Sequence, residues 1–196
     1  MKIGLDKNVI LDTAAKMADE KGIASVTLKS LAEKLCVKSP SLYKHINGLS
    51  ELNKELMLYG WSLLEKDVIK ATIGKAKDDA IIAMCYAYRN FITLHGGLFE
   101  AMQWYNMYKS DEHLQATEGI VSVLFQVLEA YDLTEEQKVH IVRMLRGFLQ
   151  GFLSIESHDG FGNALPIDET FDFSLKLLLK GINNLQKRNE CEKNEI

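Results

Sequence analysis

Residues 34–46 read KLCVKSPSLYKHI, and they combine cations with hydroxyl groups in a pattern that could bind an anion. Three lysines, a histidine, a tyrosine and two serines surround one proline, and the stretch contains no acidic residue. Ammonium, imidazolium and hydroxyl groups donate hydrogen bonds, and phosphate oxygens accept them. The whole chain is acidic, with 23 lysines and arginines against 27 aspartates and glutamates, so this grouping does not follow from the average composition.

The charge is distributed unevenly along the chain. Residues 1–50 contain eight lysines against five acidic residues, an excess of three cations, whereas residues 51–196 contain 15 cations against 22 acidic residues, an excess of seven anions. A basic segment attached to an acidic body is typical of a nucleic-acid-binding module joined to a domain with another task. An excess of three cations is equally compatible with an ordinary solvated surface.

Two short helices are predicted before the cationic stretch. The first would bury an apolar face that recurs at helical spacing: Ile10, Ala14, Met17 and Ala18. Gly22 is expected to end it. Thr27 is expected to cap the second helix, which has an apolar face of its own: Leu28, Leu31, Ala32 and Leu35.

A third helix is predicted to begin within the cationic stretch. Residues 36–38 would form a short break, and Ser39 followed by Pro40 is the pattern of an N-cap with proline at the first helical position. Leu42 and Ile46 would face inward from this helix. A supporting helix followed by two helices joined by a short turn is a helix-turn-helix, whose last helix enters the major groove of DNA. The stretch is therefore predicted to read DNA.

The stretch TLKSLAEKLCVKSPSLYKHI, residues 27–46, resembles the helix-turn-helix of TetR/AcrR-family transcriptional regulators. The matching positions are Thr27, Leu31, Ala32, Val37, Leu42, Tyr43 and His45. By this resemblance, Thr27, Tyr43 and His45 would contact phosphates, and Lys29 would fall where some members place a base-reading arginine. The remaining groove-facing positions would be Lys38, Ser39, Pro40, Ser41 and Lys44.

Three positions depart from the family pattern. Cys36 replaces the usual glycine of the turn, and either a small residue tolerated there or a redox sensor would explain it. Ile46 replaces the usual phenylalanine and would still fill a core position. Leu49 replaces a lysine that often binds phosphate at the start of the fourth helix, and the sequence leaves open whether Lys54 takes over that contact.

The rest of the chain predicts a helical bundle, so the expected fold is all-α with about nine helices. A fourth helix would follow Asn47-Gly48 and run to about Lys70. Further helices are expected at residues 77–95, 97–107, 110–131, 135–157 and 169–187. A capping box at Thr134–Gln137 would open the fourth of these. The predicted domains are residues 1–48 for DNA binding, 49–187 for ligand binding and dimerisation, and 188–196 as a polar, frayed tail.

A second group of side chains, concentrated between residues 84 and 108, could bind a small molecule. Apolar walls with a few hydroxyl or indole groups line ligand pockets, and the family resemblance implies an inducer site in this region. Core packing would explain any one of these residues as well. The predicted ligand-binding residues are Trp61, Met84, Tyr88, Phe91, His95, Phe99, Met102, Trp104, Tyr105 and Tyr108. Arg89 is the only arginine of the cluster, so the expected effector is apolar or aromatic rather than strongly charged.

Two later segments favour self-association. Residues 141–155 and 171–182 are more apolar than a one-faced surface helix requires. Gly147 and Gly151 would let another helix come close, and packing within the protomer would explain such small residues equally well. Together with the resemblance, they predict a two-fold homodimer. The resemblance implies that this dimer represses transcription at a palindromic, double-stranded operator until a small-molecule effector releases it. The alternative is a DNA-binding protein whose C-terminal domain binds a protein partner instead of a small molecule.

Patterns of enzymes, metal sites and membrane segments are missing from the sequence. It contains no HExxH, GxGxxG, Walker or GxSxG motif, and its three cysteines form no CxxC pair, so we expect no catalytic residue, no metal and no cofactor. Free thiols favour a reducing, cytoplasmic location. The longest apolar stretch is interrupted by Arg143 and Arg146, so no membrane span is expected.

Overall fold

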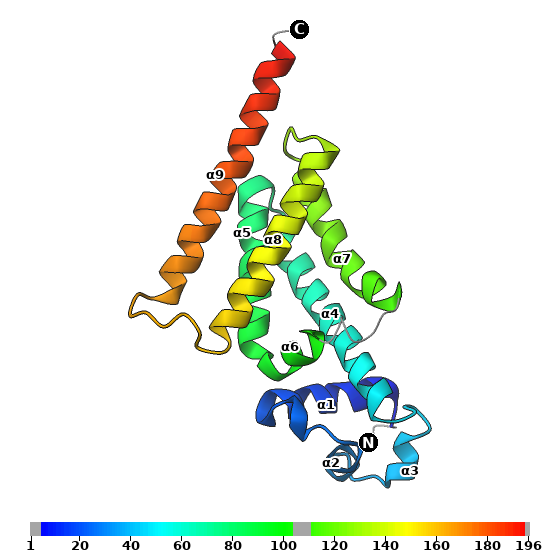
Figure 1. The fold of residues 1–196 in the computed structure, drawn as a ribbon. Coiled ribbons are helices and arrows are strands. Elements are labelled where there is room, and N and C mark those ends of the chain that lie inside the picture. Colours follow the sequence, from blue (N-terminus) through cyan, green and yellow to red (C-terminus); the bar gives the residue numbers. More distant parts are fainter. Residues whose placement is uncertain (1–4, 104–110, 195–196) are drawn as a thin grey trace. The chain divides into compact units, whose positions relative to one another are not determined.

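The computed structural model describes residues 5–103 and 111–194, and within these ranges the chain forms nine α-helices and one short 3₁₀ helix, with no β-strand. Side chains are described throughout these ranges except at residues 111–116 and 192–194. The helices are α1 (Lys7–Lys21), η1 (Ile23–Ser25), α2 (Leu28–Lys34), α3 (Ser39–Leu42), α4 (Leu49–Thr72), α5 (Lys77–Leu94), α6 (Gly96–Met102), α7 (Asp111–Leu128), α8 (Glu135–Glu156) and α9 (Ile167–Asn194) (Figure 1). The predicted all-α fold is confirmed. None of these helices has both the length and the apolar content needed to cross a membrane.

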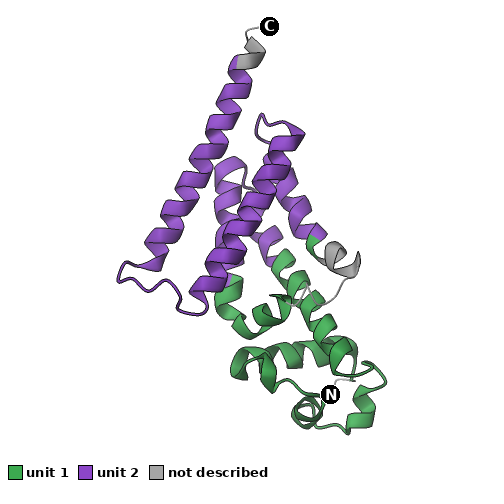
Figure 2. Cartoon of the chain, in the orientation of Figure 1, with its two compact units in different colours: residues 1–66, 91–117 green, residues 67–90, 118–196 purple. Residues whose placement is uncertain are grey.

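The helices form two compact units, coloured separately in Figure 2. Unit 1 comprises residues 1–66 and 91–117, and it contains α1, α2, α3, α6 and the first part of α4. Unit 2 comprises residues 67–90 and 118–196, and it contains α8, α9 and most of α5 and α7. The predicted DNA-binding segment lies entirely within unit 1, and a functional boundary after residue 48 stays a prediction.

The core of unit 1 supports the helix-turn-helix. The inward faces predicted for the first three helices are buried at Ile10, Ala14, Met17, Ala18, Leu31, Ala32, Leu42 and Ile46, whereas Leu28 and Leu35 of the predicted second face are only partly buried. Each fully buried leucine or isoleucine side chain contributes about 1.5–3 kcal/mol to folding. Gly22 ends α1 as predicted, with a φ of 79°. The short helices α2 and α3 therefore depend on this shared core rather than on their own length.

The turn between α2 and α3 requires one residue in the left-handed region. The Val37 amide donates to the Ala32 carbonyl at 3.0 Å and the Cys36 amide donates to the Glu33 carbonyl at 3.1 Å, a Schellman arrangement at the end of α2. Cys36 accordingly has a φ of 55°. A side chain in this region costs about 1–2 kcal/mol, which explains the glycine that the family pattern places here. The Cys36 thiol is exposed.

The N-terminus of α3 differs from the prediction. Lys38 is the N-cap, with extended φ and ψ of −78° and 142°, so the predicted N-cap at Ser39 is wrong. Ser39 and Pro40 are instead the first two helical residues. Pro40 is tolerated there because the amides of the first helical turn have no carbonyl partner within the helix.

Most other helix boundaries agree with the prediction within a few residues. One difference is that α3 already ends at Leu42, and the amides of His45 and Ile46 donate to the Leu42 carbonyl, at 2.9 and 3.0 Å, in the turn that follows. Another is that α9 continues past the predicted end at residue 187 to Asn194, so the polar stretch that we expected to fray is helical that far. The predicted end of α6 at residue 107 lies outside the described residues.

Polar contacts within unit 2 explain the length of α9. Asn183 Nδ2 donates to Asp78 Oδ2 at 2.8 Å, which joins α9 to the start of α5. Further along, Asn189 Nδ2 donates to the Asp132 carbonyl and to Gln137 Oε1, both at 2.8 Å. Each such hydrogen bond contributes about 1 kcal/mol. Contacts with α5, with α8 and with the segment before α8 therefore hold this polar part of α9 in place.

The α8–α9 turn is held by an arginine and an aromatic cluster of unit 2. Arg89 Nε donates to a carboxylate oxygen of Glu156 at 3.0 Å, and the same guanidinium pairs with Asp168 at 2.7 Å and lies 4.8 Å from the Phe171 ring centre. The hydrogen bond with Glu156 raises the pKa of Arg89, so the guanidinium stays charged. Phe171 also makes an edge contact with Phe152 at 5.2 Å. Arg89 therefore joins α5 to α8 and α9.

Candidate nucleic-acid interface

The side chains predicted to contact DNA gather on α2, α3 and the turns next to them. Thr27, Lys29, Lys38, Pro40, Tyr43 and Lys44 are exposed, and Ser39, Ser41 and His45 are partly exposed. We call this set the α2–α3 surface. The Tyr43 side chain is 54% exposed, so its ring and its hydroxyl group are both accessible to a partner. The structure thus brings the predicted residues to one part of unit 1, and their contacts with DNA stay a prediction.

The α2–α3 surface carries exposed lysines that have no carboxylate partner among the described residues. Within the part of the chain that the structure describes, no carboxylate lies within ion-pair distance of Lys29, Lys38 or Lys44. Glu33 is the only acidic residue in the segment 27–46. Binding of such lysines to DNA phosphates releases counterions from the duplex, which is the main source of sequence-independent affinity.

The N-terminal cap of α2 holds the hydroxyl group of Thr27 in place. Thr27 Oγ1 accepts the Ser30 amide at 3.1 Å, and Ser30 Oγ accepts the Thr27 amide at 3.0 Å, which confirms the predicted cap as a capping box. The Ser30 hydroxyl donates to the Ser25 carbonyl at 2.8 Å. Thr27 Oγ1 lies 2.9 Å from Ser30 Oγ, so its hydrogen can turn to that oxygen or to an acceptor outside the protein. This geometry suits a phosphate contact.

The residues predicted to bind a ligand are buried wherever the structure describes them, apart from the partly exposed His95. Trp61, Phe91, Phe99 and Met102 are buried in unit 1, and Met84 and Tyr88 are buried in unit 2. Trp104, Tyr105 and Tyr108 lie outside the described residues. Burial is expected both of core residues and of the lining of a closed pocket, so the ligand role of this cluster stays a prediction.

His95 has a specific partner in α1, within the segment predicted to bind DNA. Its Nδ1 lies 2.7 Å from Asp19 Oδ2 of α1, and its ring centre lies 4.7 Å from that of Phe91. Asp19 was not predicted from the sequence as a site residue, although Gly96-Gly97 stands at the start of α6. The pair of glycines at a helix start was the one available signal, because a glycine there can mark a close approach of two backbones.

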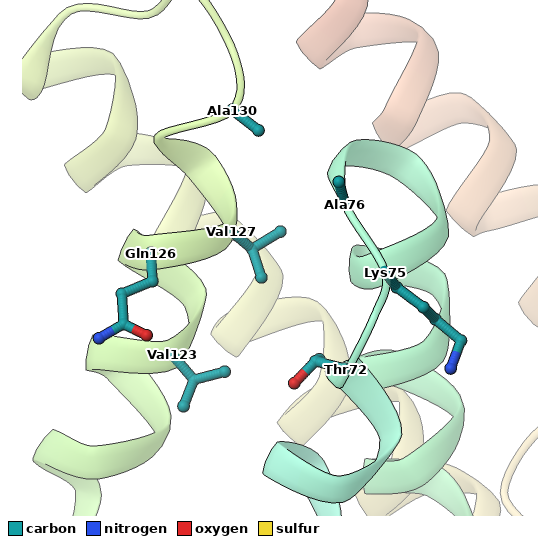
Figure 3. Close-up of a pocket in the computed structure, with 7 residues that line it drawn as sticks. All are labelled: Thr72, Lys75, Ala76, Val123, Gln126, Val127 and Ala130. Atoms are coloured by element: carbon teal, nitrogen blue, oxygen red, sulfur yellow. The ribbon is translucent and has the colours of Figure 1, made fainter.

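A hollow of about 240 Å³ lies in unit 2, at a place that the sequence did not indicate (Figure 3). It is lined by Thr72, Lys75, Ala76, Val123, Gln126, Val127 and Ala130. Val123 and Val127 of α7 point across it toward the turn that follows α4. Its volume is below the range of roughly 300–1,000 Å³ that is usual for small-molecule sites. None of the predicted ligand-binding residues lines this hollow.

A helix-turn-helix with an exposed cationic surface, joined to a helical bundle, defines the class of helix-turn-helix DNA-binding regulators. Within this class, the chain belongs to the TetR family of transcriptional regulators. Residues 10–47 match the family described as bacterial regulatory proteins of the tetR family, and residues 81–178 match the tetracyclin repressor-like C-terminal domain. The members of this family are DNA-binding regulators and not enzymes.

One relative and two solved structures show the extent of the similarity. The chain is 30% identical over 181 residues to YobS of Bacillus subtilis, named an uncharacterized HTH-type transcriptional regulator, and this match covers 92% of this chain and 94% of YobS. BioQ with its double-stranded DNA operator has a TM-score of 0.66 and 24% identity, covering 91% of this chain and 98% of BioQ. A TetR variant from Acinetobacter baumannii in complex with minocycline has a TM-score of 0.68 and 18% identity, covering 93% and 99% of the two chains. The two structural matches support the fold.

Proposed function

We propose that this protein is a repressor that binds a near-palindromic operator as a homodimer and leaves it when a small apolar or aromatic effector binds. The observation that carries DNA binding is the α2–α3 surface, where three lysines without a carboxylate partner among the described residues are exposed, as is Tyr43. The BioQ–operator structure supports this mode of binding, and the minocycline complex supports a small-molecule effector. The protein would act in the cytoplasm, where bacterial DNA is found.

Lys44→Ala and Tyr43→Ala are expected to weaken binding to every DNA sequence by about the same factor, because phosphate contacts carry no base information. Lys44→Ala should also reduce the slope of log affinity against log salt concentration by about one unit. The measurement is fluorescence anisotropy with operator and random duplexes at several salt concentrations. Lys70→Ala is the control, because Lys70 is an exposed lysine that pairs with Asp67 outside this surface. Wild-type affinity in both test variants would contradict the interface.

The same titrations separate base-reading residues from phosphate-binding residues. If Lys29 or Ser41 touches bases, Lys29→Ala or Ser41→Ala should relax the sequence preference at particular operator positions. A good bidentate contact is worth roughly 1–3 kcal/mol of discrimination, and a single contact is worth less. An unchanged preference at every position in both variants would assign base reading to other residues of the α2–α3 surface.

Exposed apolar side chains on α8 and α9 support the homodimer. On α8, Met144 and Ile155 are 39% and 45% exposed, and Gly147 and Gly151 continue the same helical face. A Cβ atom added to either glycine would meet no other atom within 4 Å, so another helix could come close there. On α9, three positions four residues apart form a similar face: Phe173 (62% exposed), Leu177 (56% exposed) and Gly181, where an added Cβ also meets nothing. We propose that these two faces, the α8–α9 faces, bind their copies in a second protomer.

The effector is proposed to bind the aromatic and sulfur-containing residues that the sequence predicts for it. Operator and effector must then weaken each other's binding by one common factor, expected to be about 5–150-fold, because linkage between two sites is reciprocal. A thermal-shift screen would first find a compound that binds the protein. Calorimetry would then measure the affinity of the protein for this compound with and without saturating operator. A duplex of scrambled sequence is the control. Equal affinities would mean that the cluster has no regulatory role, and the protein-partner alternative would then be preferred.

A further inference from the structure

Helix α6 lies closer to α1 than ordinary side chains allow. A Cβ atom added to Gly97 would lie 2.0 Å from the carbonyl oxygen of Ala18 and 2.8 Å from the amide nitrogen of Asp19. The backbones of α1 and α6 are therefore in direct contact. At the other end of α6, Met102 packs onto Gly60 of α4, where an added Cβ would lie 2.7 Å from Met102 Cγ. Within unit 1, α6 thus touches both α1 and α4.

Asp19 of α1 completes the N-terminus of α6. His95 is the N-cap residue of α6, but its side chain makes no capping hydrogen bond. Asp19 Oδ1 instead accepts the Leu98 amide at 3.0 Å, which is the bond that an N-cap side chain usually accepts. Asp19 Oδ2 lies 2.7 Å from His95 Nδ1. The Asp19 side chain is only 17% exposed, so water competes little for these bonds.

Hydrogen bonds continue from the end of α1 to the start of α2. The Ser25 hydroxyl lies 2.8 Å from the carbonyl of Gly22, the C-cap residue of α1, and 3.3 Å from the carbonyl of Met17 within α1. The Ser25 carbonyl in turn accepts the Ser30 hydroxyl at 2.8 Å, and Ser30 holds Thr27 in the capping box. The position of α1 therefore determines where the Thr27 hydroxyl lies on the α2–α3 surface.

We propose that Asp19 is a positioning residue for DNA binding, because it fixes α1 on α6 and thereby holds α2 and α3 in the arrangement that fits DNA. Without the two Asp19 bonds, α1 can shift against α6 while α6 still contacts α4 through Met102. Only a fraction of the molecules then has the binding arrangement, and the apparent affinity equals the intrinsic affinity multiplied by that fraction. The contacts made in the bound complex are unchanged. This inference rests on the proposed DNA-binding function and is independent of the effector.

The test compares full-length Asp19→Ala with the wild type on a duplex that the wild type selects from a random-sequence library. We expect the affinity to fall about tenfold, within the 5–150-fold range of typical coupling, with the salt slope unchanged because no phosphate contact is lost. Asp12→Ala is the matched control, since Asp12 lies on the same helix and pairs with Lys16 at 2.7 Å on the exposed side. Asp19→Asn keeps an oxygen for the Leu98 amide, so it should recover most of the affinity.

Several results would overturn the inference. Equal affinities of Asp19→Ala and Asp12→Ala would show that Asp19 does not position the surface, and a shallower salt slope would show that Asp19 acts through a lost DNA contact. A loss of helical circular dichroism in Asp19→Ala would show that Asp19 holds the fold itself rather than the arrangement of a folded unit. If the wild type selects no duplex at all, the proposed DNA-binding function fails, and this inference fails with it.

Discussion

Leu177→Glu is expected to convert the homodimer into a monomer and to lower operator affinity by about a hundredfold or more. Leu177 is 56% exposed on α9, so a carboxylate there is solvated in the monomer and leaves the fold intact. In a two-fold interface the same substitution would bury two unpaired carboxylates at once, each at a cost of several kcal/mol. The loss of affinity follows because a monomer contacts one half-site only and loses the gain from simultaneous binding.

Light scattering coupled to size-exclusion chromatography measures the assembly directly. Ile73→Glu is the control, because Ile73 is 72% exposed at the turn that follows α4 and lies outside the α8–α9 faces. This variant should stay dimeric and bind operator like the wild type. A Leu177→Glu variant that remains a dimer at micromolar concentration would place the interface on another part of the chain.

Gly97→Ala is expected to lower the free energy of unfolding by about 3 kcal/mol, at the upper end of the usual cost of overpacking. The new methyl group would lie 2.0 Å from the Ala18 carbonyl oxygen, and backbone atoms cannot move aside as a flexible side chain can. Either α6 or α1 must shift, which also breaks the hydrogen bond between Asp19 and the Leu98 amide.

Gly96→Ala provides an unusually close control for this prediction, because the two glycines are neighbours in the same helical turn. A Cβ atom added to Gly96 meets no atom within 4 Å, so the substitution should be neutral or should stabilise the protein by up to about 1 kcal/mol. Urea denaturation followed by circular dichroism measures both variants. Equal midpoints would contradict the direct backbone contact between α1 and α6.

Local sequence signals predicted the helix ends well where a side chain caps its own helix. Thr27 and Thr134 cap their helices as predicted, Thr134 in the predicted capping box, and Gly22 ends α1. The predicted N-cap of α3, Ser39, lies one residue after the observed N-cap, Lys38. The Ser-Pro pair does not fix this position, since proline fits the first and second helical positions alike. A one-residue difference of this kind does not change which residues are exposed on the α2–α3 surface.

Features that depend on distant residues were not predictable in this way. The end of α9 is polar, and nothing in its own sequence shows that Asn189 meets Gln137 of α8. Asp19 appeared only as one acidic residue of α1, because its partner Leu98 is far along the chain. For the same reason, the sequence identified the aromatic cluster but could not distinguish core packing from ligand binding, and burial alone does not distinguish them either.

The exposed thiol in the turn between α2 and α3 has a practical consequence for spectroscopy. Burial raises the pKa of the Cys85 thiol to about 12, so this thiol reacts slowly, whereas Cys36 and Cys191 are exposed. Replacing Cys191 by serine leaves Cys36, in the turn between α2 and α3, as the one exposed cysteine. A spin label attached there would mark each half of a homodimer once, and pulsed electron resonance would then report the separation of the two DNA-binding turns directly.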